Sequence, residues 1–596
     1  MSTTYSEVWD LESIFPGGSD SKAFQDHLKN LTEMTTAFSE KMNQFQTPHS
    51  KDQAEIVAEQ IENAKNVIMN LRQAGAFVSC LEAQNMADKQ ANVLRSQVTT
   101  LSAQFSTAFN TFQQKLAAST DQVWKGLLQH PALSELEFVL EEWRKKATDK
   151  LSEQEEALIE SLSVDGYHGW GQMYDTIVGS MTIPFTLDGE EKELSVGQAN
   201  NLGSHSDPKV RKKIFEKLEK AWGEKEELFA KTLNHLAGFR LNVYEKRGWD
   251  HVLKEPLEYN RMQQDTLDAM WGAITKHKGA FVKYLNRKAE LLGKEKLDWY
   301  DLNAPISSEK ETLSYEQGAK FILKHFEKFG PEMAQFAEKA FDGAWIEAED
   351  RPGKRPGGFC TSFPLSEESR IFMTYSGSMS NVATLAHELG HAFHSHTLKP
   401  MHPLNRSYAM NVAETASTFA EAIVADAAVK EASSEEQQKS LLEDKLQRSV
   451  AMFMNIHSRF LFETRFYEER KNGVVPASRL NELMVDAQQE AYGGAINEAH
   501  PRFWASKLHF YITGVPFYNF PYTFGYLFSL SIYAKAIEEG TDYEEKYMAL
   551  LRDTAIMSVE ELAMKHLGED ITQEAFWEKG INLCVQDAET FLKLTK

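Results

Sequence analysis

The sequence predicts a mainly α-helical protein of two lobes, with a small β-sheet inside the second lobe. Most of the chain consists of segments rich in Ala, Leu, Glu, Gln and Lys, with apolar residues three and four positions apart. Between residues 351 and 375, turn residues flank two short runs of β-forming residues. At 596 residues the chain is several times longer than a minimal domain, so we expect more than one lobe.

The first 200 residues are predicted to form a helical lobe. A helical pattern with few Pro or Gly residues extends from about residue 20 to residue 180. Ser152 and Glu155 have the spacing of a capping box, which predicts that a helix begins there. The following segment 182–191 contains β-forming residues and the turn signal Asp188-Gly189, which predicts a hairpin. We therefore divide the chain into an N-terminal helical lobe, 1–200, and a catalytic lobe, 201–596.

The second lobe is predicted to be helical again, with one interruption. Helical patterns occupy about 207–294 and 315–340. The segments 351–364 and 369–375 then predict a small sheet, directly before a histidine-rich helix.

Composition and charge exclude several classes of partner. The chain has 64 Lys and Arg residues against 87 Asp and Glu residues, a formal net charge of -23. This charge repels the phosphates of nucleic acids and anionic lipid surfaces. We therefore expect no nucleic-acid partner and no membrane partner.

The cysteines and the N-terminal residues favour a cytoplasmic location. Cys80, Cys360 and Cys584 are far apart and lack CxxC spacing, so neither disulfides nor thiolate metal sites are predicted. The first ten residues lack a basic stretch followed by an apolar core, and no apolar run reaches membrane-spanning length.

The segment His387-Glu-Leu-Gly-His391 carries the strongest chemical signal. On a helix over 381–398, His387, His391 and His394 lie opposite the apolar face. Imidazoles at positions i and i+4 can bind one Zn²⁺ ion, and Glu388 then lies beside the metal. There it can take a proton from the attacking water and pass it to the leaving amine. The alternative is a chance match on a solvated helix face.

A catalytic zinc site requires a third protein ligand and one open position. A second helix is predicted to begin near Tyr408. If the two helices pack antiparallel, Glu414 lies level with the histidine pair. Glu421, two turns further, can then accept a hydrogen bond from a ligand imidazole. A solvated acidic face is the alternative for both glutamates, and His394 is expected to line the cleft or to support the ligands.

These segments resemble the zinc oligopeptidases, the family of thimet oligopeptidase and oligoendopeptidase F. The motif 387–394 is similar to the family's extended HExGHxxH pattern, and 412–419 resembles the segment that holds its glutamate ligand. The resemblance covers most of the chain, including 9–15, 151–158 and 247–249. It implies one zinc ion per chain and a deep, narrow channel between two lobes, with the small sheet along its wall.

The resemblance also implies that a C-terminal histidine and tyrosines bind substrate and stabilise the tetrahedral intermediate. In the segment 509–526 these residues are His509, Tyr522 and Tyr526. Tyr522 and Tyr526 are one turn apart on a helix that follows Pro521, so their hydroxyls could face a common oxygen. The alternative is an aromatic core cluster, and the assignment among the tyrosines, including Tyr511 and Tyr518, stays open.

The function expected is a zinc endopeptidase that cuts short unfolded peptides, held as an added strand at the sheet edge near 358–375. One alternative is an exopeptidase, similar to a dipeptidyl carboxypeptidase, on the same scaffold. The other is a non-catalytic peptide-binding protein with a structural zinc, against which Glu388 argues. Either a monomer or a dimer agrees with the sequence.

Overall fold

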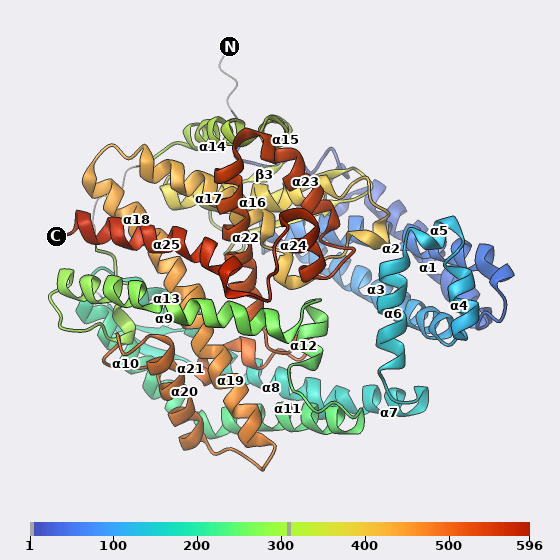
Figure 1. Cartoon of the computed structure of the whole chain (residues 1–596), viewed down its shortest axis with the longest axis horizontal. Helices are drawn as coiled ribbons and strands as arrows, with labels where there is room; N and C mark the ends of the chain where they lie inside the picture. Colours follow the sequence, from blue (N-terminus) through green and yellow to red (C-terminus); the bar gives the residue numbers. More distant parts are fainter. Residues whose placement is uncertain (1–4, 188, 307–311) are drawn as a thin grey trace.

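The computed structural model describes residues 5–187, 189–306 and 312–596. The mainly helical prediction is confirmed, since helices follow one another along the described chain and the strands form two small sheets (Figure 1). Helices of the first 150 residues lie together on one side of the molecule, apart from the central helices α16, α17 and α22.

The N-terminal part is a stack of long helices followed by shorter ones. It comprises α1 (Lys22–Gln44), α2 (Ala54–Gln84), α3 (Lys89–Ala117), α4 (Asp121–Leu127), α5 (Pro131–Ser134), α6 (Glu137–Thr148) and α7 (Glu153–Ser163). Helices α1, α2 and α3 pack against one another. The capping box predicted at the start of α7 is present, with Ser152 accepting from the Glu155 backbone and Glu155 accepting from the Ser152 backbone.

The remaining helices form the larger part of the molecule. They are α8 (Gly169–Gly179), α9 (Val196–Asn201), α10 (Pro208–Glu224), α11 (Glu226–Lys246), α12 (Lys254–Tyr259), α13 (Gln264–Leu291), α14 (Tyr315–Phe329), α15 (Pro331–Asp342), α16 (Met379–Thr397), α17 (Thr415–Lys430), α18 (Glu435–Val450), α19 (Ile456–Arg470), α20 (Ala477–Ala491), α21 (Phe503–Ser506), α22 (Phe520–Glu539), α23 (Glu544–Asp553), α24 (Val559–Leu567) and α25 (Glu574–Leu594).

The buried apolar side chains form two separate clusters. The first contains residues from Trp9 to Leu140 together with Phe363, Phe372 and Leu404 from later in the chain, and the second begins at Tyr167. The predicted hairpin is present as strands β1 (Ile183–Leu187) and β2 (Glu190–Leu194), although Asp188 of its turn lies outside the described residues. Its inward-facing side chains belong to the second cluster. Up to Leu140 the buried apolar residues belong to the first cluster, and from Tyr167 all but Phe363, Phe372 and Leu404 belong to the second. The lobe boundary near residue 200 stays a prediction.

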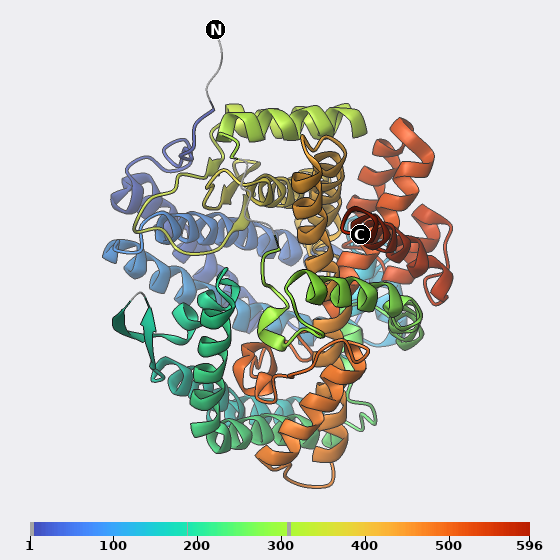
Figure 2. The same ribbon diagram turned by 90° about the vertical axis from the view of Figure 1, so that its left-hand side faces the viewer.

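The small sheet predicted between 351 and 375 is confirmed. It consists of β3 (Ile346–Glu347), β4 (Phe359–Phe363) and β5 (Glu368–Phe372) in the order β3-β5-β4. Strand β5 lies between the other two, parallel to β3 and antiparallel to β4. Strand β4 is therefore an edge strand. In Figure 2 the N-terminal helices pass beside this sheet, and α2 packs against β4 and β5. Helix α16 packs against the same two strands, which places the sheet next to the histidine motif.

The cysteines and the apolar character of the helices are two further features of the fold. The three cysteines, all in the described part of the chain, are free thiols. Among the helices that the structure describes, none combines the length and the apolar character needed to cross a membrane.

Candidate metal centre

Helix α16 carries the histidine motif. Its first turn is stabilised by a capping box, in which the Ser378 side chain accepts from the Asn381 backbone and the Asn381 side chain accepts in return. Val382, Leu385 and Leu389 are fully buried. The apolar face is thus anchored in the second core, and His387 and His391 project from the other side of the helix.

Helix α17 begins later than the sequence predicted. It starts at Thr415, and Glu414 is its N-cap residue. The preceding segment instead forms a short 3-10 turn, Met410–Val412. The Asn411 backbone N–H donates to the side chain of Asn260, a contact with a distant part of the chain that the local pattern does not reveal. The predicted start near Tyr408 was therefore wrong, and Glu414 sits at the end of a turn rather than inside a helix.

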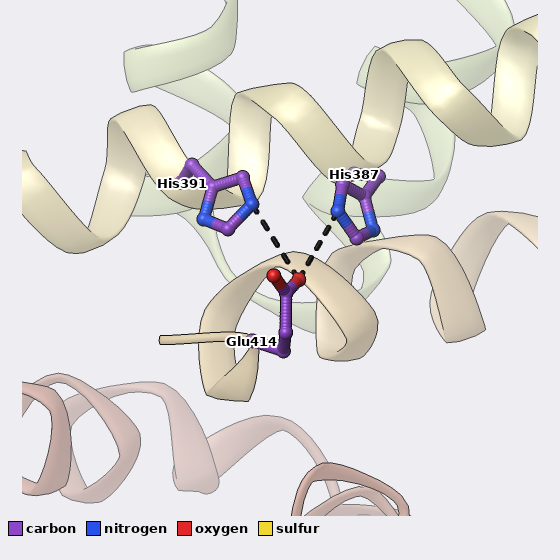
Figure 3. Close-up of side chains that lie close together, drawn as sticks. All are labelled: His387, His391 and Glu414. Carbon is purple, nitrogen blue, oxygen red and sulfur yellow. Dashed lines mark ion pairs between the residues drawn. The ribbon is translucent and has the colours of Figure 1, made fainter. Parts of the chain in front are cut away.

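The structure brings His387, His391 and Glu414 together (Figure 3). The Nε2 atoms of the two histidines lie 3.2 Å and 3.5 Å from the same Oε2 atom of Glu414. One donor atom from each residue lies within 4.8 Å of the other two, a spacing that a single ion can bridge. Two imidazole nitrogens and a carboxylate are the donor set of a catalytic zinc site, so the residues fit this metal.

Neighbouring side chains fix two of the three donors. His387 Nδ1 lies 3.0 Å from Glu421 Oε2, which leaves Nε2 of the same ring free to bind a cation. Glu421 in turn forms an ion pair with Arg448. The Ser417 hydroxyl donates to Glu414 Oε2 at 2.6 Å. Glu421 thus occupies the position that the sequence analysis assigned to it, whereas Ser417 and Arg448 carried no signal in the sequence.

The charges of the cluster favour cation binding. Burial opposes ionisation of Glu414, but its hydrogen bond to His387 and the two imidazoles hold the pKa at about 2. Burial lowers the pKa of His391 to about 4. A carboxylate and a neutral imidazole are the forms that bind a metal.

Glu388 lies beside this cluster and is nearly enclosed. It is 7% exposed, and its Oε2 atom has no hydrogen-bond partner among the described residues. Burial, together with the charge of Glu414, raises the pKa of Glu388 to about 7, although His387 opposes the shift. A cation at the neighbouring donors would favour the carboxylate. Gly358, next to β4, lies close by, since a Cβ there would be 3.4 Å from Glu388 Oε1.

Gly390 allows α16 and α17 to approach closely enough for Glu414 to reach the histidines. A Cβ at this position would lie 2.5 Å from the carbonyl oxygen of Ala416 and 2.6 Å from Cα of Ser417. Both atoms belong to the main chain, so a side chain could be accommodated only if the helices moved apart.

We expect Gly390→Ala to lower metal occupancy and to reduce hydrolysis by roughly a hundredfold, because Glu414 would shift relative to the histidines. Overpacking should also destabilise the fold by about 1–3 kcal/mol. Gly75→Ala is the matched control, since Gly75 also lies within a helix and a Cβ there meets nothing within 4 Å. Metal content, activity and thermal unfolding of both variants test this, and equal behaviour would contradict it.

His394 does not support the metal ligands in the way the sequence analysis expected. It is fully buried, and its Nε2 atom lies 2.9 Å from Thr554 Oγ1 and 3.2 Å from the Leu551 carbonyl oxygen. Its ring stacks on Tyr408. His394 therefore joins α16 to the end of α23. Its ring nitrogen contacts α23 and not the metal ligands.

An aromatic cluster lies next to the metal ligands. The rings of Tyr518 and Tyr522 are 5.5 Å and 6.2 Å from the ring of His509 and 5.6 Å from each other. Helix α22 passes close to Glu414, since a Cβ at Gly525 would lie 3.1 Å from the Cβ atom of Glu414. Tyr522 lies three residues earlier on the same helix, so α22 brings it to the site. His509 Nδ1 has no hydrogen-bond partner among the described residues. Burial and the nearby cations Arg459 and Lys507 lower the pKa of His509 to about 4.

The structure does not bring Tyr526 to this cluster. Its hydroxyl lies 3.1 Å from Ser449 Oγ and 3.7 Å from Cys584 Sγ, in the interior between α18 and α25. Tyr511 is also buried and stacks on Tyr174. Of the tyrosines left open by the sequence, Tyr518 and Tyr522 are thus the ones that face His509.

Comparison with known proteins identifies the family. The model of peptidase family M3 matches residues 201–583, and the model described as oligopeptidase F matches residues 115–183. The chain belongs to peptidase family M3. It is a metalloendopeptidase of the oligoendopeptidase F type, as the resemblance implied.

Relatives of this M3 peptidase match over nearly the whole chain. An oligoendopeptidase F homolog of Lactococcus lactis is 23% identical, over 91% of this chain and 90% of its own. Oligopeptidase PepF of Bacillus subtilis is also 23% identical, over 92% of this chain and 81% of its own.

Solved structures share the fold. A peptidase of Chlamydophila abortus matches with a TM-score of 0.84 at 18% identity, over 100% of this chain and 99% of its own. Oligoendopeptidase-F of Enterococcus faecium matches with a TM-score of 0.69 at 20% identity, over 97% of this chain and 99% of its own.

Proposed function

We propose that this M3 peptidase is a zinc endopeptidase that hydrolyses internal bonds of short unfolded peptides. The convergence of His387, His391 and Glu414 on one point, beside the buried carboxyl of Glu388, carries this proposal. When bound, zinc would lower the pKa of water and polarise the peptide carbonyl.

Glu388 is proposed to move the proton. Its unpartnered Oε2 atom can accept a proton from the attacking water and deliver it to the amine that leaves. Burial keeps other water away from this carboxyl, so the proton is passed between two defined atoms. Glu421 holds the His387 ring by its Nδ1 atom, which keeps the ligand oriented during the reaction.

His509, Tyr518 and Tyr522 are proposed to bind the substrate carbonyl. Their rings form one cluster on the side of α22 that approaches Glu414. A tyrosine hydroxyl can donate to the oxyanion that forms as the carbonyl is attacked. A neutral His509 can donate from one ring nitrogen in the same way.

The edge strand β4 is proposed to align the peptide. Gly358 precedes this strand and lies near Glu388, so a peptide added to the edge would pass the base. Main-chain hydrogen bonds to the edge accept many side-chain sequences and fix the direction of the chain. Short unfolded peptides can adopt this extended form along the edge strand, whereas folded proteins cannot.

We expect Tyr522→Phe to reduce kcat by roughly 10²–10³-fold with little change in KM, because a hydroxyl that donates mainly in the transition state is lost. Tyr526→Phe is the matched control from the same helix, since its hydroxyl faces Ser449 and Cys584. Steady-state kinetics on a short peptide compare the two. A larger kcat loss in Tyr526→Phe would restore the assignment made from the sequence.

Endopeptidase and exopeptidase activity can be separated with a peptide blocked at both ends. Incubation of this peptide with the enzyme, followed by mass spectrometry, should yield fragments from internal cleavage. A chelator should abolish them. Cleavage of the unblocked peptide alone, with release of terminal dipeptides, would favour the exopeptidase.

A further inference from the structure

Tyr518 is the exposed member of an otherwise buried turn. Pro516, Phe517, Asn519 and Phe520 are buried, whereas Tyr518 is partly exposed and faces His509. Helix α22 begins only at Phe520, so Tyr518 lies outside the helix and the helical hydrogen bonds do not hold it. The position of Tyr518 therefore depends on how the residues on either side of it are held.

The turn is strained on one side of Tyr518 and capped on the other. Phe517 has a φ of 53°, an unfavourable conformation for a residue with a bulky side chain. Asn519 is the N-cap of α22, and its side-chain oxygen accepts from the Phe520 backbone. The Asn519 backbone N–H donates to the Phe517 carbonyl at 2.7 Å, which closes the turn around Tyr518.

Glu463 of α19 lies against this turn. Its carboxyl accepts a hydrogen bond from the Asn519 side chain. Burial raises the pKa of this carboxyl to about 8, against the opposing effects of Arg240, Asn519 and the main chain of Phe517. Glu463 is 6% exposed, and Arg240 is the cation whose charge acts on it. A polar group buried this deeply is costly unless it is hydrogen-bonded, so the bond to Asn519 ties Glu463 to the turn.

We propose that Glu463 is a positioning residue that clamps the turn 517–519 and so aims the Tyr518 hydroxyl at the substrate carbonyl. Glu463 does not contact substrate in this account, and it acts through Tyr518. The inference rests on the proposed function, in which Tyr518 and Tyr522 bind the carbonyl.

A double-mutant cycle on the metal-loaded enzyme tests the clamp. Glu463→Gln keeps the shape but replaces one accepting oxygen by an NH₂ group, so one flank loses its partner. We expect kcat/KM to fall by roughly a hundredfold at unchanged metal content, because the hydroxyl is misplaced. In this background Tyr518→Phe should cost less than about twofold more, since coupled residues are not additive.

Glu443→Gln is the matched control. Glu443 lies on α18, is similarly buried, and forms an ion pair with Lys288 at 2.8 Å. This variant should lose stability while its folded fraction keeps the wild-type kcat/KM. Tyr518→Phe should therefore lower kcat/KM by the same factor in this background as in the wild type. If Glu463→Gln does not fold, Asn519→Ser serves instead, because serine can cap α22 but is too short to reach Glu463.

Hydrogen exchange of segment 509–522 provides a readout that does not require hydrolysis. The amides of 517–520 should exchange faster in Glu463→Gln than in the wild type, and should be unchanged in Glu443→Gln. Additive losses in the cycle, or unchanged exchange in this segment, would overturn the clamp. Full activity of Tyr518→Phe would overturn it as well. An inactive wild-type enzyme would instead contradict the proposed function, and the exchange result would still decide about Glu463.

Discussion

The variant Glu388→Gln is expected to keep about one zinc ion per chain and to lose hydrolysis by roughly 10²–10⁴-fold, the usual contribution of a general base. The amide has nearly the same shape and leaves His387, His391 and Glu414 in place, but it cannot accept the proton of the attacking water. Metal analysis and peptide hydrolysis on the same preparation measure both effects.

Glu338→Gln is the control for this experiment, because Glu338 is exposed on α15. It should match the wild-type enzyme in metal content and in rate. Wild-type turnover by Glu388→Gln would remove Glu388 from the mechanism. Loss of the metal from this variant would instead give Glu388 a role in binding.

Glu414→Ala should have the largest effect on metal affinity, since it removes one of the three converging donors. Two imidazoles alone hold zinc poorly, so the variant should be largely metal-free and inactive. Glu421→Ala should weaken affinity by only about tenfold to a hundredfold, because Glu421 orients His387 without contacting the ion. Competition with a chelator of known affinity ranks the two variants.

The reverse ranking of these two glutamates would reverse the ligand assignment. Ser417→Ala tests the same point from another direction, because the hydroxyl of Ser417 donates to Glu414. Its loss should weaken affinity less than the loss of Glu414 itself.

The local sequence pattern predicted α16 and the small sheet, two of the elements that position the candidate site. The spacing of His387 and His391, with an apolar face behind them, predicted α16, and the turn residues around 351–375 predicted the small sheet. The placement of Glu414 required one further assumption, that α16 and α17 pack antiparallel. The predictions of α16 and of the small sheet succeed because periodicity and turn chemistry are properties of neighbouring residues.

The features that the sequence did not predict depend on distant contacts. The segment before α17 is hydrogen-bonded through Asn411 to Asn260, and His394 is hydrogen-bonded to Leu551 and Thr554. One helical turn relates Tyr522 and Tyr526, yet the second is buried because α18 and α25 cover it. Helical spacing gives the direction of a side chain relative to its neighbours, but it does not show which face another element will cover.

We expect hydrolysis to depend on one metal ion held by His387, His391 and Glu414. This dependence is tested most directly by removing the metal, adding zinc in steps and following internal cleavage of a peptide blocked at both ends. We predict that activity rises in proportion to zinc and reaches its plateau at about one equivalent per chain, and that Glu414→Ala shows no such rise. Full cleavage by the metal-free enzyme, or an equal rise in Glu414→Ala, would contradict the account.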